Sequence, residues 1–325
     1  MMKRRLFNRL AMTAAVAMLA CNAIAEEYPA RPVTLIVPFA TGGALDAMAR
    51  VIGSKMSDTL GQSVVIDNRA GASGVVGMNV VARAKPDGYT ILYTPNSIAI
   101  GPALYRKLPF DAEKDFIPVT QLLVTNLVVA AHPKTNLRTV KDLVSMAKAN
   151  PGKLNFGSSG VADPLQLGME MLKTMAGIQM VAVPYKGQAP MFQALLAGEV
   201  DVAVVSIQLA LAPIKSGKLN VLAAGSPKRL TALPDVPTVA ETGYPGYEIA
   251  SWHALFAPAG TPRAIVERLQ REAHKAVNHP EVRKRVEATG NEIVGSTPTE
   301  FAASFKADVA RFKKIARDAR LPYQD

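Results

Sequence analysis

Short apolar runs alternate with longer segments of helical periodicity along most of the chain. The runs are rich in Val, Ile and Leu, and they are bounded by Gly, Pro or Asn. This pattern is typical of strands buried on both faces of a mostly parallel sheet. The predicted strands span residues 33–37, 64–66, 90–93, 127–131, 154–156, 180–183, 200–205, 221–224 and 253–256.

Helical patterns fill the intervals between these strands. The predicted helices span residues 45–60, 74–84, 139–149, 164–176, 189–197 and 262–278. Two of them begin with a capping residue followed by proline, Asp163-Pro164 and Thr261-Pro262. Proline is well suited to the first helical position because that position needs no N–H. The alternation of strands and helices predicts an α/β fold.

A last helix is predicted from an apolar stripe near the C-terminus. Phe301, Phe305, Val309 and Phe312 recur at helical spacing, and basic residues surround them. Such a stripe usually packs against the helix's own domain, and we favour that interpretation. A basic amphipathic helix can also lie on a membrane or bind an acidic partner.

The first 25 residues have the pattern of a secretory signal peptide. A basic start precedes an apolar run at residues 10–20, and Ala23-Ile24-Ala25 supplies the small residues that a signal peptidase reads. The run is too short to cross a bilayer, which takes about 20 apolar residues. We predict cleavage after Ala25 and export to the periplasm. Lipid attachment at Cys21 is the less favoured alternative, because Met18-Leu19-Ala20 is an imperfect lipoprotein motif.

The formal net charge of +11 raises the question of a nucleic-acid function. Removing the four basic residues of the predicted signal lowers the net charge to +7, and acidic residues interrupt the remaining basic ones. No platform of aromatic and basic residues for single-stranded nucleic acid is visible in the sequence. We therefore expect no nucleic-acid partner.

Metal and cofactor sites are not indicated either. The single cysteine excludes an intramolecular disulfide and a thiolate-rich zinc site. His274 and His279 are not spaced to share one helix face, as a metal-binding pair would. The glycines of residues 71–77 do not have the spacing of a dinucleotide-binding fingerprint. We expect no cofactor and no metal.

The segment from Pro38 to Asp46 carries the strongest chemical signal. An apolar strand runs into Thr41-Gly42-Gly43, and a helix follows. Glycines let consecutive backbone N–H groups face a ligand, and a helix start adds unpaired N–H donors and a positive dipole end. This combination predicts a site for a carboxylate or phosphate, although such a turn also occurs for packing reasons. Asp46 in the first helical turn is predicted to be a structural cap.

A second loop of the same kind follows another predicted strand. Phe156-Gly157-Ser158-Ser159-Gly160 leads through Asp163 into a helix, and its hydroxyl and N–H donors suit carboxylate oxygens. The serines lack the Gly-x-Ser-x-Gly spacing of a nucleophile elbow, and no histidine is an obvious partner for them. We therefore do not expect an enzyme.

Several motifs give the chain a resemblance to a known family. They are Tyr28-Pro29, Arg31-Pro32, residues 38–50, residues 68–74, residues 86–90, residues 156–160, residues 183–187, residues 233–243 and residues 257–262. In this order and spacing they make the chain similar to the Bug-type receptors, the extracytoplasmic solute-binding components of tripartite tricarboxylate transporters. The resemblance covers essentially all of residues 26–325.

The resemblance implies a type II periplasmic binding protein fold, with two α/β domains, a hinge and a central ligand cleft. Domain I would contain residues 26–127 and 251–325, and domain II residues 128–250. The protein would be a monomer that captures a small di- or tricarboxylate or aromatic acid and delivers it to membrane permease subunits. A periplasmic sensor that presents the bound acid to a two-component kinase is the alternative.

The resemblance also implies a set of ligand-binding residues. They are Phe39, Ala40, Thr41, Gly43, Leu45, Asn96, Gly157, Ser158, Ser159, Asp163, Val205 and Ser206. The sequence departs from its relatives at Val205 and Ser206, where an Asp or Asn is common, and at Leu45, where a small polar residue is common. Both changes make the pocket more apolar, so a ligand ammonium group would lose hydration without a partner. We therefore favour a carboxylate with an apolar or aromatic body over an acidic amino acid.

Overall fold

The computed structural model describes residues 28–288, 290–318, 321 and 323 of the 325-residue chain. The predicted signal peptide at residues 1–25, its cleavage site after Ala25 and the lipid attachment considered at Cys21 lie outside the described residues. None of the helices in the described ranges has the length and apolar character needed to cross a membrane.

The described residues form ten strands, which are arranged in two groups that share one long strand. Their bounds are β1 (Val33–Val37), β2 (Val64–Asn68), β3 (Thr90–Pro95), β4 (Phe116–Ala131), β5 (Asn155–Ser158), β6 (Val181–Pro184), β7 (Val202–Ser206), β8 (Asn220–Ala224), β9 (Ala250–Pro258) and β10 (Glu292–Ile293). The predicted strands at 127–131 and 253–256 are parts of β4 and β9, which extend well beyond the predicted limits. β10 was not predicted, and it has only two residues.

The helices cover the faces of these strands. Their bounds are α2 (Ala44–Leu60), α3 (Val75–Ala82), α4 (Ser97–Leu104), α5 (Val140–Ala149), α6 (Pro164–Ala176), α7 (Gln188–Ala197), α8 (Ile207–Lys215), α9 (Arg263–Asn278), α10 (Pro280–Ala288) and α11 (Pro298–Asp318), with short 3₁₀ turns at Ala72–Gly74, Pro133–Thr135 and Ala240–Thr242. The sequence prediction missed α4, α8 and α10. Both α4 and α8 contain an internal proline, Pro102 and Pro213, which weakens the helical signal, and α4 is also almost wholly apolar and has no clear polar face.

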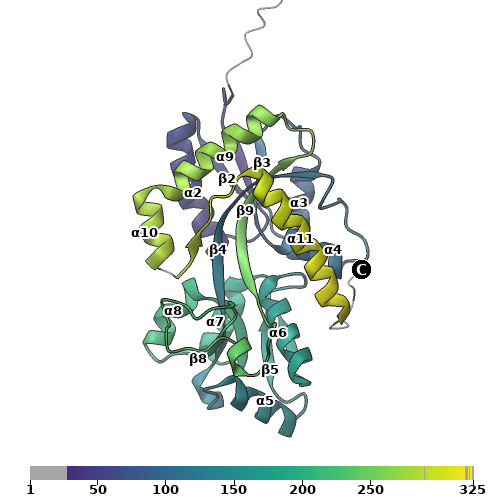
Figure 1. Ribbon diagram of the computed structural model, residues 1–325, viewed down its shortest axis with the longest axis vertical. Coiled ribbons are helices and arrows are strands. Elements are labelled where there is room, and N and C mark those ends of the chain that lie inside the picture. The colour runs from purple at the N-terminus through teal and green to yellow at the C-terminus, as the bar shows by residue number, and fades with distance from the viewer. Residues whose placement is uncertain (1–27, 289, 319–320, 322, 324–325) are drawn as a thin grey trace, which may run out of the picture.

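Two lobes are visible in Figure 1, with β4 and β9 running from one into the other. The first lobe contains the strand order β2-β1-β3-β9-β4, and the second contains β4-β7-β5-β6 with β8 also paired to β4. β4 changes partner between Asn126, which is paired with Ala250, and Leu127, which is paired with Ser206. The predicted domain boundaries near residues 127 and 250 remain a prediction, and this change of partner falls beside them.

The sheet is mixed rather than mostly parallel. β1 is parallel to β2 and β3, and β5 is parallel to β6 and β7. β4 runs antiparallel to its neighbours in both lobes, and β9 runs antiparallel to β3 and β4. The expectation of a mostly parallel sheet was wrong because the two strands that join the lobes run against the local βαβ direction.

The C-terminal helix packs against the first lobe. Phe301, Phe305, Val309 and Phe312 of α11 are buried, as the apolar stripe predicted. Trp252 of β9 packs edge-to-face against Phe301, with ring centroids 5.4 Å apart, and its Nε1 donates to Asp308 Oδ2 at 2.7 Å. The apolar stripe of α11 therefore packs against the protein's own first lobe.

Candidate functional site

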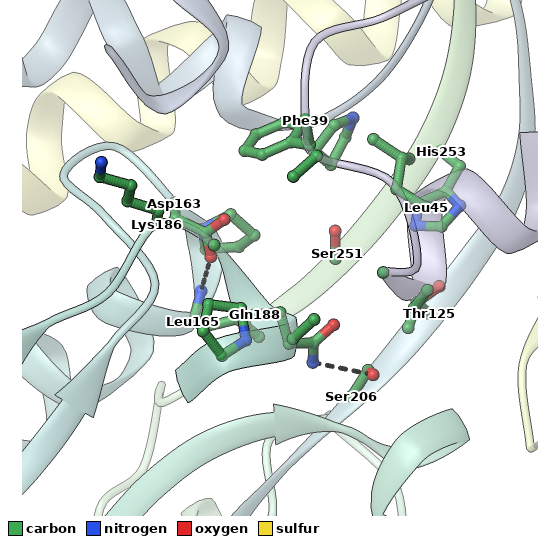
Figure 2. Close-up of a pocket in the computed structure, with 18 of the residues that line it drawn as sticks. Phe39, Leu45, Thr125, Asp163, Leu165, Lys186, Gln188, Ser206, Ser251 and His253 are labelled. Carbon is green, nitrogen blue, oxygen red and sulfur yellow. Dashed lines mark hydrogen bonds between the residues drawn. The ribbon is translucent and has the colours of Figure 1, made fainter. Parts of the chain in front are cut away.

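A cleft of about 740 Å³, including open solvent at its mouth, lies between the two lobes. The first lobe and the crossing strands contribute Phe39, Ala40, Thr41, Gly43, Ala44, Leu45, Pro95, Thr125, Leu127, Ser251 and His253. The second lobe contributes Asp163, Pro164, Leu165, residues 186–190 and Ser206. Figure 2 shows the labelled side chains of this lining, such as Phe39 and His253 on one side and Asp163 and Gln188 on the other, around one space.

The start of α2 forms part of the first lobe's wall. Gly42 has φ +84°, a backbone conformation that favours glycine, and its N–H donates to Asp46 Oδ2 at 3.0 Å. Arg50 Nε donates to the same oxygen at 3.1 Å. Burial acts to raise the pKa of Asp46, but the Arg50 and Gly42 donors outweigh it and hold the pKa below its usual range. Asp46 is thus an ionised group that fixes the turn.

The helix that follows this turn has no side-chain cap. Gly43 is its N-cap and carries no side chain, so the first-turn N–H groups are not satisfied by a capping residue. Gly43, Ala44 and Leu45 all line the cleft. The positive end of the α2 dipole therefore faces the cavity with free donors.

Three helices of the second lobe also begin at the cleft. α6 is capped by its own Asp163, whose Oδ1 accepts from Leu165 N at 2.9 Å. α7 begins after Gly187 and α8 after Ser206, and neither has a side-chain cap. The Ser206 hydroxyl instead accepts from Gln188 Nε2 at 2.9 Å, as Figure 2 shows. Uncapped helix starts thus lie on both sides of the cleft.

Asp163 is the one acidic side chain among the described residues that line the cleft. It is buried, and burial raises its pKa to about 6 although the Ser159 hydroxyl and the Leu165 N–H oppose the shift. Exposed Lys186 also lines the cleft.

His253 is the one histidine that lines the cavity among the described residues. It is only 4% exposed, and its Nδ1 lies 2.8 Å from the hydroxyl of fully buried Tyr93. The two rings meet edge-to-face, with centroids 5.5 Å apart. Burial lowers the pKa of His253 to about 3, so its ring is neutral at physiological pH.

The structure brings seven of the twelve sequence-predicted binding residues to the cleft: Phe39, Ala40, Thr41, Gly43, Leu45, Asp163 and Ser206. Asn96, Gly157, Ser158, Ser159 and Val205 do not line it. Asn96 is fully buried, and its Nδ2 donates to Ala250 O at 3.0 Å, which ties the end of β3 to β9. Val205 precedes Ser206 on β7, so its side chain points to the opposite face of the sheet.

The loop after β5 also differs from expectation. Gly157 lies within the sheet, where a side-chain Cβ would come 2.7 Å from Met191. The Ser158 hydroxyl accepts from Gly160 N at 3.3 Å and supports the turn. Of this loop, Asp163 is the first residue that lines the cleft. Ser158 and Ser159 are buried and do not reach it.

Sequence reasoning missed the segment at residues 186–190 and several residues on β4 and β9. Lys186-Gly187 precedes a helix, so it carried the same local signal of a glycine turn before a helix that identified the other two loops. Thr125, Leu127, Ser251 and His253 had no such signal, because the strands that carry them are neighbours only in the folded chain.

The lining chemistry suits binding of an organic anion. It offers backbone N–H groups, hydroxyls and an amide around apolar side chains. The part of the chain that the structure describes contains no group of three or more His, Cys, Asp or Glu residues that could hold a metal ion.

Comparison with known proteins identifies the family. The model of the tripartite tricarboxylate transporter family receptor matches residues 48–321. The chain belongs to this family. Its members are solute-binding receptors and not enzymes, which confirms the expectation from the sequence.

Solved structures confirm the periplasmic binding protein fold. R. palustris Rpa4515 with adipate is 34% identical, with a TM-score of 0.87 over 92% of this chain and all of that chain. The periplasmic binding protein BugD is 33% identical, with a TM-score of 0.87 over 91% of this chain and all of BugD. MatC from Rhodopseudomonas palustris with bound malate is 31% identical, with a TM-score of 0.85 over 89% of this chain and 99% of MatC.

Proposed function

We propose that this receptor captures a small organic carboxylate in its cleft and delivers it to the membrane permease subunits of a tripartite tricarboxylate-type transporter. The observation that carries the proposal is the arrangement of uncapped helix starts, α2 in one lobe and α7 and α8 in the other, around one cavity. Their free N–H groups and positive dipole ends attract anions. The adipate and malate of the two solved relatives are both carboxylates.

The walls between these helix starts favour a ligand with an apolar body. Phe39, Leu45, Leu127 and Leu165 line the cleft, and Ser206 contributes a neutral hydroxyl there. Among the described residues that line the cleft, Asp163 is the acidic side chain that could pair with a ligand ammonium. Its Oδ1 already accepts from Leu165 N as the cap of α6, so this carboxylate is engaged within the protein. We therefore still favour an aliphatic or aromatic acid over an acidic amino acid.

Isothermal titration calorimetry with four probes tests both statements. Adipate and benzoate represent acids with apolar bodies, malate adds a hydroxyl, and aspartate adds an ammonium group. We expect tight binding of at least one of the first three and weaker binding of aspartate. Tight binding of aspartate alone would overturn the preference for an apolar body, and no binding of any carboxylate would overturn the proposed ligand class.

Delivery to a permease is tested in cells. We expect deletion of the gene for this chain to abolish uptake of the radiolabelled acid that calorimetry identifies, and a copy that retains residues 1–25 to restore it. A periplasmic monomer fits this role, and light scattering of the purified protein measures the oligomeric state. Unchanged uptake together with loss of a kinase-dependent transcriptional response would favour the sensor alternative.

A further inference from the structure

Tyr93 and His253 form a buried pair at the wall of the cleft. They lie on adjacent antiparallel strands, β3 and β9, and the Tyr93 hydroxyl is 2.8 Å from His253 Nδ1. Tyr93 is fully buried and does not line the cavity, whereas His253 does. The tyrosine is therefore shielded from the cavity, and the histidine has access to it.

The surroundings of the pair decide which ring nitrogen carries the proton. Among the described residues the Tyr93 hydroxyl has one hydrogen-bond partner, Nδ1 of His253. If Nδ1 carried the proton, it would donate to the phenol oxygen, and the phenol hydrogen would be left in a dry interior without an acceptor. If Tyr93 donates instead, Nδ1 accepts and the proton of the neutral ring resides on Nε2.

Nε2 of His253 is then a donor that the described part of the chain does not use. No described residue accepts a hydrogen bond from Nε2, and the His253 side chain lines the cavity together with Thr125 and Ser251 (Figure 2). Because the buried ring stays neutral, it offers an N–H without a full positive charge. A neutral N–H donor binds an oxygen acceptor and gives nothing to an ammonium group.

We propose that His253 is a specificity-determining residue, whose Nε2–H donates to a carboxylate oxygen of the bound ligand, and that Tyr93 is the positioning residue that fixes this tautomer. The proposal deepens the proposed function and rests on it for the identity of the ligand class. It adds a fixed side-chain donor on the crossing strand β9 to the backbone donors of the helix starts.

Nitrogen-15 NMR of the histidine side chains tests the tautomer without any ligand. We expect the His253 Nδ1 resonance in the range of an unprotonated nitrogen and the Nε2 resonance in the range of a protonated one. In Tyr93→Phe, the preference for this tautomer is expected to weaken. A protonated Nδ1 in the unmodified protein would overturn the proposal even if the receptor binds carboxylates.

Calorimetry with adipate and malate tests the contact. We expect His253→Leu to lower the affinity about tenfold, which corresponds to about 1.4 kcal/mol, and His253→Gln, which keeps an N–H donor, to recover part of the loss. Tyr93→Phe is expected to lower the affinity about threefold. Tyr247→Phe is the matched control, because it removes another buried hydroxyl, which donates to Gly168 O at 2.9 Å and does not line the cleft.

The outcomes separate the two proposals. Unchanged affinity in His253→Leu and Tyr93→Phe, with folded proteins by circular dichroism, would overturn the role of His253 and leave carboxylate binding intact. An equal loss of affinity in Tyr247→Phe and Tyr93→Phe would also overturn it, because a general loss of packing would then explain both. Failure of the unmodified protein to bind any carboxylate would overturn the proposed function itself.

Discussion

Asp163 and His253 both line the cleft, and burial moves their pKa values in opposite directions. Burial disfavours a charged form, so the pKa of Asp163 rises to about 6 and that of His253 falls to about 3. The stability contribution of Asp163 is complete below its unfolded pKa and is lost as the pH rises through about 6. That of His253 is complete above its unfolded pKa of about 6.5 and is lost as the pH falls towards 3. The cleft wall therefore carries a carboxyl charge at pH 8 that is mostly removed at pH 5.

Asp163→Asn is expected to raise the affinity for adipate about tenfold at pH 8, because the ionised carboxylate repels the ligand and asparagine still caps α6. At pH 5 the two proteins should bind alike, since Asp163 is then mostly protonated. Calorimetry at both pH values gives the ratio of affinities, in which the ligand's own ionisation cancels. Asp142→Asn at the exposed start of α5 is the control, and a ratio independent of pH would contradict this prediction.

Ser206→Asp should reverse the charge preference of the cleft. The new carboxylate would lie at the start of α8, and we expect adipate affinity to fall at least tenfold while aspartate gains a partner for its ammonium. Calorimetry with both ligands measures the change. Ser54→Asp on the exposed face of α2 adds the same charge outside the cleft. Equal losses in the two variants would attribute the effect to net charge instead of to the site.

At the scale of elements, local signals predicted helices well and strand neighbours poorly. α6 follows its Asp163-Pro164 start, and α11 follows its apolar stripe, because both signals lie within the segment that forms the helix. α4 gave no such signal because it is almost wholly apolar, and the internal Pro213 weakened the signal of α8. The loops at Phe39–Leu45 and Asp163 were likewise predictable from turn chemistry. The contact between Tyr93 and His253 depends on β3 pairing with β9, and nothing near either residue in the sequence specifies that pairing.

The turn before α2 can be tested for its role in protein stability and in ligand binding at the start of that helix. Asp46→Ala would release the Gly42 N–H and the Arg50 side chain, so we expect a loss of about 1–3 kcal/mol in the free energy of unfolding and roughly tenfold weaker ligand binding. Chemical denaturation and calorimetry measure the two effects. Asp58→Ala, an exposed position near the other end of α2, is expected to change neither by a comparable amount.

For the whole molecule, the position of the cleft follows from the path of two strands. β4 pairs with β9 in the first lobe and with β7 and β8 in the second, so the lobes are connected through a continuous strand. The α2 start belongs to one lobe and the α7 and α8 starts belong to the other (Figure 1). A ligand that binds both sets of N–H donors at once would draw the lobes together by bending these strands.

The pairing of Asn126 with Ala250 also gives the chain a simple topological description. Paired antiparallel residues lie about 4.5–5.5 Å apart, which is a gap that a two-residue turn can close. If the second lobe spans residues 127–249, it is a large insertion at the tip of a β-hairpin. Replacing residues 127–249 with Asn-Gly should leave a smaller protein that keeps the Tyr93–His253 hydrogen bond and melts cooperatively by circular dichroism, but no longer binds the acid. A shortened chain that fails to fold would mean that the first lobe needs the inserted segment for stability. The two lobes would then form a single folding unit.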